Sequence, residues 1–106
     1  MSLLDRAFRR PSATHSEAAA VGHRGVWVYH RPGCPFCLRL TLGLGWRARD
    51  ARWIDIWADA DAAGYVRSVN GGDETVPTVV VDGVPRTNPD PGQVREALAA
   101  GAWVGS

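Results

Sequence analysis

The chain has few of the features that mark secreted or membrane-bound proteins. It holds only two cysteines among 106 residues, too few for a disulfide scaffold in a domain of this size. No stretch approaches the roughly 20 apolar residues that span a membrane. Leu3-Leu4 and residues 18–21 are too short for the apolar part of a secretory signal. We therefore expect a cytoplasmic protein with no membrane partner.

Lysine and an excess of either charge are also missing. All 12 basic side chains are arginine, which we interpret first as a bias towards GC-rich codons. The formal net charge is +1, so the chain lacks the excess of positive charge that is typical of nucleic-acid-binding proteins. We therefore expect no nucleic-acid partner. The length suits one domain with a single hydrophobic core.

The two cysteines, Cys34 and Cys37, lie two residues apart, directly after a strand-like stretch at residues 26–29. A pair at this spacing, between a strand and a helix, is typical of a redox site. A cysteine at a helix N-terminus ionises more easily, because unpaired N–H groups and the helix dipole stabilise the thiolate that exchanges disulfides. We therefore predict Cys34 as the nucleophile and Cys37 as the resolving thiol, with Arg31 adding positive charge nearby.

Two other interpretations of the cysteine pair are a half zinc site and two inert core thiols. A zinc site needs about four ligands. Only His30 is close in sequence, since His15 and His23 belong to the N-terminal segment. We interpret His30 as a loop or strand-end residue and expect no bound metal.

Local patterns predict four strands and three helices. Strands are expected at residues 25–29, 52–57, 78–81 and 84–86. Helices are expected at residues 34–47, from Asp59 or Asp61 to Asn70, and from a capping Asp90 to Gly101. The order β-α-β-α-β-β-α implies an α/β fold with a four-stranded mixed sheet and helices on both faces.

The segment at residues 34–47 fits both a strand and a helix, because its leucines alternate and also pair at helical spacing. Pro35 favours the helix, since proline suits the first helical position and interrupts a central strand. Gly43 and Gly45 weaken that helix by about 1 kcal/mol each, and we expect them to allow close packing on the sheet. Pro85 marks its strand as a sheet edge.

The chain divides into an N-terminal extension at residues 1–24, a domain at residues 25–101 and a C-terminal tail at residues 102–106. We expect the extension to be mobile or loosely docked. The alternative is a short interaction helix, capped by Ser2 and carrying Leu4 and Phe8 one turn apart.

A second motif, Thr75-Val76-Pro77, stands just before the strand at residues 78–81. Proline is tolerated as the first residue of a strand, and a bond before proline adopts the cis form most readily. A cis bond would turn the backbone of Val76 outward, where its N–H and C=O groups could hold an extended thiol substrate beside Cys34. The alternative is an ordinary entry into a strand.

With both motifs, the chain resembles the glutaredoxins of the thioredoxin-like superfamily, over about residues 25–100. Among them it is most similar to the mycoredoxins, which use mycothiol in place of glutathione. The resemblance lies in residues 34–40, 66–72, 75–79 and 87–89. It implies a thioredoxin/glutaredoxin-like fold and a thiol-disulfide oxidoreductase that reduces mixed disulfides between proteins and a small thiol.

The resemblance also implies roles for single residues. It implies Cys34 as the attacking thiolate, Cys37 as the second thiol, Pro77 as a cis-proline and Val76 as a backbone clamp. The candidate site for the small thiol comprises Arg31, Pro35, Phe36, Thr75, Val76, Pro77, Thr87 and Asn88.

The segment at residues 87–90 departs from the glutaredoxin pattern. It reads Thr-Asn-Pro-Asp where glutaredoxins usually carry a Gly-Gly pair and an acidic residue for glutathione, which favours mycothiol. Mycoredoxins usually carry Gly-Tyr where this chain has Pro35-Phe36. The alternatives are a redoxin coupled to glutathione or thioredoxin reductase, an iron–sulfur cluster carrier sharing a cluster through Cys34, and a non-catalytic module that docks through its extension. We expect a monomer.

Overall fold

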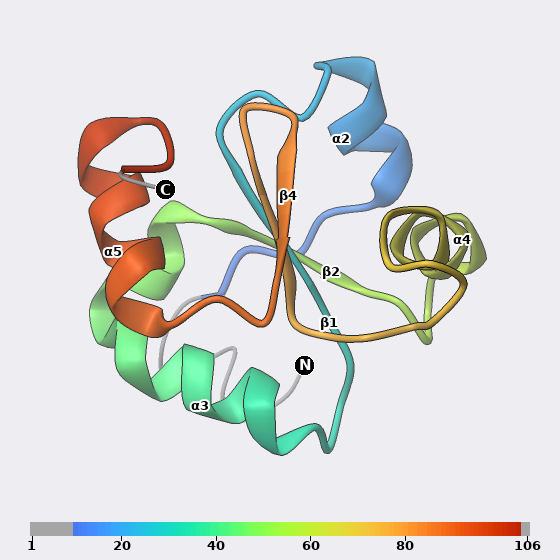
Figure 1. Cartoon of the computed structure of the whole chain (residues 1–106), viewed down its shortest axis with the longest axis horizontal. Helices are drawn as coiled ribbons and strands as arrows, with labels where there is room; N and C mark the ends of the chain where they lie inside the picture. The colour runs from blue at the N-terminus through green and yellow to red at the C-terminus, as the bar shows by residue number, and fades with distance from the viewer. Residues whose placement is uncertain (1–9, 105–106) are drawn as a thin grey trace.

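The computed structural model describes residues 10–104 and forms one mixed sheet between two layers of helices. Its strand order is β2-β1-β3-β4, with β1 and β2 parallel and the other two pairs antiparallel. Figure 1 shows α3 and α5 on one side of the sheet and α2 and α4 on the other. The fold class expected from the sequence is confirmed. The elements are α2 (His15–Ala20), β1 (Val26–His30), α3 (Pro35–Leu44), the 3₁₀ helix η1 (Gly45–Asp50), β2 (Arg52–Asp55), α4 (Ala60–Val69), β3 (Thr78–Val81), β4 (Val84–Thr87) and α5 (Pro91–Ala100).

Strand β1 is the centre of the core, and all five of its residues are buried. Its side chains alternate between two hydrophobic clusters, because successive residues of a strand point to opposite faces. Val26 and Val28 pack with residues of α3 and α5, while Trp27 and Tyr29 pack on the side of α2 and α4. This double cover places the end of β1, and the cysteine pair that follows it, at one edge of the core.

Helix α3 is shorter than its leucine pattern predicts. It ends at Leu44 because Gly45 adopts a positive φ of 58°, and a 3₁₀ helix continues to Asp50. Trp46 is exposed and packs against the guanidinium groups of Arg47 and Arg49. Gly43 lies close to Pro91 of α5. The prediction that this glycine allows close packing on the sheet is therefore wrong, because the neighbour that it approaches is a helix.

The other helix ends and the hairpin follow their local sequence signals. Asp59 caps α4 by accepting a hydrogen bond from the Ala62 N–H at 3.2 Å, and Asp90 forms a capping box with Gln93 at α5. The turn at Asp82-Gly83 has two positive φ angles, as a two-residue hairpin requires. Strand β2 ends at Asp55 rather than at residue 57, because the Asp55 carboxylate accepts a hydrogen bond from the Trp57 N–H and closes a turn.

Residues 10–24 pack against the domain, in contrast to the expected mobile or loosely docked extension. Ser12 pairs in parallel with Trp53 of β2, and backbone hydrogen bonds of 2.8 and 2.9 Å join Trp53 to Pro11 and Ala13. Ala18 of α2 is fully buried in the cluster on that side. The helix expected to begin at Ser2 lies outside the described residues, and the domain boundary at residue 25 stays a prediction.

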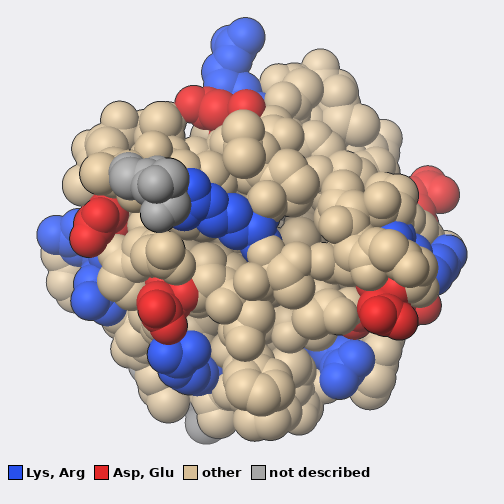
Figure 2. Space-filling view, viewed as in Figure 1, with Lys and Arg blue, Asp and Glu red and all other residues tan. Residues whose placement is uncertain are grey.

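The surface carries both charges side by side. On the face shown in Figure 2, arginine and acidic side chains are scattered among uncharged residues, with no large area of one sign. Within residues 10–104, every helix is too short or too polar to cross a bilayer.

Candidate active site

Cys34 lies between the end of β1 and the first residue of α3. It is the N-cap residue of α3, with an extended backbone (φ −84°, ψ 118°), and Pro35 follows as the first helical residue. The backbone N–H groups of Phe36 and Cys37 at the start of this helix lower the pKa of the Cys34 thiol. The first turn of the helix therefore provides the anion-stabilising donors that the sequence led us to expect.

The two thiols differ in acidity. Burial alone would raise the pKa of Cys34, but the hydrogen bonds from the Cys37 backbone and thiol and the Phe36 N–H, with the charge of Arg31, lower it below its ordinary value. Burial raises the pKa of Cys37 to about 12. Cys34 is therefore the thiol that ionises, and Cys37 can donate its hydrogen to the Cys34 sulfur.

The Thr75-Val76-Pro77 motif lies directly beside the cysteine pair. The peptide bond between Val76 and Pro77 is cis, as expected from the sequence. The Cys34 thiol donates a hydrogen bond to the Val76 carbonyl at 3.8 Å, across 42 residues of sequence. This contact places the backbone of Val76 beside Cys34; Val76 is buried, and the preceding Thr75 is exposed.

The Thr87-Asn88 segment is held next to the same loop. The Asn88 N–H donates to the Pro77 carbonyl at 2.7 Å. The Thr87 hydroxyl donates to the amide oxygen of Asn70, whose amide nitrogen donates to the Thr78 hydroxyl at 3.0 Å. The fold therefore brings two of the predicted segments together, although about ten residues separate them in the chain.

Arg31, Pro35 and Phe36 lie within three residues of Cys34 in the chain. The Arg31 guanidinium lies 5.9 Å from the ring centroid of Trp57, which is itself exposed. Phe36 directly follows Pro35 in α3, and its apolar ring is 53% exposed. These residues give the site one positive charge and an apolar surface.

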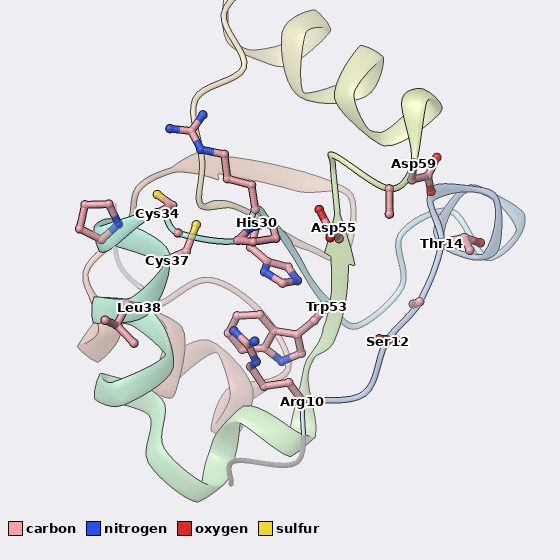
Figure 3. Close-up of a pocket in the computed structure, with 16 residues that line it drawn as sticks. Arg10, Ser12, Thr14, His30, Cys34, Cys37, Leu38, Trp53, Asp55 and Asp59 are labelled. Atoms are coloured by element: carbon pink, nitrogen blue, oxygen red, sulfur yellow. The ribbon is translucent and has the colours of Figure 1, made fainter. Parts of the chain in front are cut away.

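A cavity of about 740 Å³ opens beside the cysteine pair, and Arg31 and Pro35 also line it (Figure 3). The segment from Arg10 to Thr14 forms one wall, and the redox loop with the start of α3 forms the opposite one. Arg10 is largely buried, donates to the Thr41 hydroxyl at 3.0 Å and lies over the Trp53 ring at 5.0 Å. The labelled residues of Figure 3 that line the cavity are Arg10, Ser12, Thr14, His30, Cys34, Cys37, Leu38, Trp53, Asp55 and Asp59.

The comparison with known proteins assigns the family. The family model described as Glutaredoxin matches residues 26–85, which is more than half of the chain. The chain belongs to the glutaredoxin family. It is therefore a thiol-disulfide oxidoreductase, of a family that acts on mixed disulfides with a low-molecular-weight thiol.

Two bacterial relatives support this assignment. A Mycobacterium tuberculosis protein with a provisional name as a glutaredoxin is 40% identical over 72 residues, which cover 67% of this chain and 86% of the relative. Mycoredoxin 1 of Corynebacterium glutamicum is 42% identical over 65 residues, which cover 60% of this chain and 80% of that protein.

Solved structures show the same fold. The solution structure of a glutaredoxin from Brucella melitensis superposes with a TM-score of 0.58 at 24% identity, covering 76% of this chain and 94% of that one. A crystal structure of a thioredoxin-like protein gives a TM-score of 0.56 at 25% identity, covering 69% of this chain and 97% of that one.

Some residues of this glutaredoxin's site were not among those predicted. Asn70 links Thr78 and Thr87, and its sequence signals are its place in the segment 66–72 that carries the family resemblance and its amide side chain at a helix end before two glycines. His30 was expected at a loop or strand end and is the last residue of β1, but its place in the cavity was not predicted. Within residues 10–104, no cluster of three or more histidine, cysteine or acidic side chains is arranged to hold a metal ion.

Proposed function

We propose that this glutaredoxin reduces mixed disulfides between cytoplasmic proteins and mycothiol. The observation that carries the choice of thiol is the 42% identity to a protein named mycoredoxin, over 65 residues. The segment at residues 87–90, which lacks the Gly-Gly pair expected for glutathione, supports the same choice. A reducing compartment suits this activity, because the small thiol pool must return the enzyme to its reduced state.

The proposed reaction begins at Cys34. Its thiolate attacks the mycothiol sulfur of the mixed disulfide, so that a new disulfide forms between Cys34 and mycothiol while the protein thiolate leaves and takes up a proton. The lowered pKa of Cys34 keeps the attacking thiolate populated. A second mycothiol then attacks the sulfur of the bound mycothiol, which forms oxidised mycothiol and releases Cys34 as its thiolate. In the other route, Cys37 attacks the Cys34 sulfur, which forms the Cys34–Cys37 disulfide and releases the bound mycothiol as its thiolate.

The candidate small-thiol site supports the first of these steps. The Val76 carbonyl lies 3.8 Å from the Cys34 sulfur, so a thiol joined to Cys34 would lie along the backbone of Thr75 and Val76. Arg31 supplies positive charge, and Pro35 and Phe36 supply apolar contact at the opening. Pro77, Thr87 and Asn88 form the supporting side of this clamp.

The decisive experiment is mass spectrometry of the intact protein after exposure to oxidised mycothiol and, separately, to oxidised glutathione. We expect Cys34 to carry mycothiol in the Cys37→Ser variant, which traps the adduct. Equal or greater labelling by glutathione would refute the choice of thiol and leave the family chemistry intact.

Turnover with a mycothiol mixed disulfide tests the roles of the two cysteines. Cys34→Ser should abolish reduction, because the attacking thiolate is lost. Cys37→Ser should keep much of it, because a second mycothiol can complete the reaction. Full activity of Cys34→Ser would overturn the assignment. Parallel assays with glutathione and with thioredoxin reductase, each with its recycling system, distinguish the other couplings.

A further inference from the structure

The resolving step requires that Cys37 lose a proton. A thiol attacks a disulfide only as its thiolate, yet Cys37 is 3% exposed and its pKa is raised to about 12 by burial. In the reduced protein its thiol donates to the Cys34 sulfur. Once Cys34 is joined to a substrate sulfur, that sulfur is no longer an anion, so the Cys37 proton needs another acceptor.

His30 is placed to receive this proton. It ends β1, four residues before Cys34, and it is 9% exposed to solvent. Its ring stands edge-on to Trp53 at 5.4 Å between centroids, and it lines the same cavity as Cys37. In the view of Figure 3 the imidazole lies between the Cys37 sulfur and the Trp53 ring. Imidazole is the side chain whose ordinary pKa lies nearest to neutrality.

The cavity supplies the path between the two groups. Its volume of about 740 Å³ is many times the roughly 30 Å³ that one water occupies in the liquid. The charged and titratable groups around it are Arg10 from the N-terminal segment, Arg31 and Cys34 from the redox loop, Cys37 from α3, Asp55 from β2 and Asp59 before α4. The lining is otherwise largely apolar, so these polar groups are the places where water can be held and can relay a proton over a short distance.

We propose that His30 is the proton acceptor for Cys37 in the resolving step, through water in this cavity. As Cys37 attacks, its proton passes to the unprotonated nitrogen of the His30 imidazole and a disulfide forms between Cys37 and Cys34. The bond between Cys34 and the substrate sulfur breaks, and that sulfur leaves with the electron pair as a thiolate. The proton on His30 then returns to solvent or to the released thiolate.

This role goes beyond the matched family domain, because residues 10–14 form one wall of the cavity and precede the matched region. It rests on the roles proposed above for Cys34 and Cys37. The alternative is that His30 only packs against Trp53 and supports the strand end. These two roles of His30 predict different pH dependences for the attack of Cys37 on the Cys34 disulfide.

Stopped-flow mixing of the reduced protein with Ellman's reagent isolates that step. The first release of thionitrobenzoate reports attack by Cys34, and the second, intramolecular release reports attack by Cys37. Thionitrobenzoate is a weak base, so the leaving group cannot take the Cys37 proton itself. Loss of the first phase would count against the proposed function, whereas a change confined to the second phase concerns His30.

We expect His30→Gln to leave the first phase unchanged and to slow the second by about tenfold or more near neutral pH. In the wild type the second phase should rise with the deprotonation of one group, the His30 ring, and then level off. In the variant it should keep rising with pH towards the pKa of Cys37. His15→Gln, the same change at a histidine outside the cavity, should retain the wild-type second phase. An unchanged rate and pH profile in His30→Gln would overturn the proposal.

Chemical rescue distinguishes a base from a packing residue. Added imidazole should restore the second phase in His30→Ala, since the cavity has room for it, and should have no effect on the wild type. Failure of rescue in a folded His30→Ala variant counts against the proposal. If neither variant folds, NMR titration of the His30 ring in the wild type decides: its midpoint should coincide with that of the second phase, and a separate midpoint overturns the role.

Discussion

At the scale of the residue, backbone position makes the two cysteines unequal. Cys34 occupies the N-cap position of α3, where the N–H groups of Phe36 and Cys37 lower its pKa, whereas Cys37 lies inside the first turn and burial raises its pKa. The spacing and Pro35 were enough to predict this difference, because a helix start is a local event. The contribution of the Cys37 thiol itself, as a donor to Cys34, depends on side-chain placement.

The acidity of Cys34 gives the first prediction. Cys37→Ala should raise the pKa of Cys34, because it removes the thiol that donates to the Cys34 sulfur. Cys37→Ser is the matched control, since its hydroxyl can still donate, and its effect should be smaller. The pH dependence of the rate of Cys34 alkylation measures both. Identical profiles for Cys37→Ala and the wild type would contradict the account of the site.

At the scale of the element, glycines decide how α3 is packed. A Cβ atom added at Gly43 would lie 2.4 Å from the Cβ of Pro91, which is part of a rigid ring at the start of α5. Gly64 of α4 has a different environment, because its added Cβ would approach only the flexible end of Arg67 at 3.6 Å. The sequence alone does not distinguish these two helical glycines.

The second prediction compares them. Gly43→Ala should lower the free energy of unfolding by about 1–3 kcal/mol, because the clash outweighs the better helix propensity of alanine. Gly64→Ala should raise it by up to about 1 kcal/mol, since only the propensity changes. Urea unfolding of both variants measures the difference. A stabilised Gly43→Ala variant would show that α3 and α5 are not in close contact at this position.

A histidine and tyrosine cluster attaches α2 to the sheet. The Tyr29 hydroxyl lies 2.8 Å from Nδ1 of His15 and 2.7 Å from Nε2 of His23, and the Tyr65 ring stacks on His23. Burial, with the nearby Tyr65 and Asp59, raises the pKa of Tyr29, so its hydroxyl keeps its single hydrogen. That hydrogen can be donated to only one imidazole, which must then be unprotonated at the nitrogen that faces it.

The third prediction is a loss of stability in acid. Burial and the neighbouring His15 lower the pKa of His23 below 6.5, so the unfolded chain takes up this proton more readily than the folded one. The contribution of His23 to the free energy of unfolding is therefore fully present above pH 6.5, and it is lost as the pH falls below that value. Urea unfolding above and below pH 6.5 measures this change, and His23→Gln should flatten it. An equally steep loss in that variant would assign the effect to other groups.

At the scale of the whole molecule, both edges of the sheet are protected. Residues 11–13 cover the outer edge of β2 through their hydrogen bonds to Trp53. On the opposite edge, Pro85 removes a backbone donor from β4, and the Trp103 indole donates to the Val84 carbonyl at 2.8 Å. Exposed strand edges promote association between chains, so these devices favour a monomer.

The fourth prediction concerns the N-terminal edge. The full chain should be a monomer by sedimentation equilibrium, and deletion of residues 1–14 should promote self-association and lower the thermal midpoint, because it uncovers β2. Deletion of residues 1–9 is the control, since it leaves the pairing of Pro11 and Ala13 with Trp53 in place. A truncated chain without residues 1–14 that stays monomeric and equally stable would contradict this role.

Signals that act over a few residues were sufficient for much of the fold. The caps at Asp59 and Asp90, the turn at Asp82-Gly83 and the helix start at Pro35 each depend on neighbours within one or two turns. The groups that form a cap or a turn are neighbours in the chain and can meet however the rest of the chain is packed. The local sequence is therefore enough to predict these features. The end of α3 was misplaced because the exposed Trp46 continues the apolar pattern without entering the core.

The sequence by itself determined the order of strands and main helices from β1 to α5, and the cysteine pair with its unequal members. The cis bond before Pro77 was one of two alternatives that the sequence left open, and the helix α2 was not predicted. Only the tertiary structure decided which distant groups share a site. Arg10 meets Thr41 across 31 residues, Cys34 meets Val76 across 42, and His30 shares a cavity with the N-terminal segment. The reason is physical: these contacts depend on how the sheet and helices pack, and no local propensity specifies that packing.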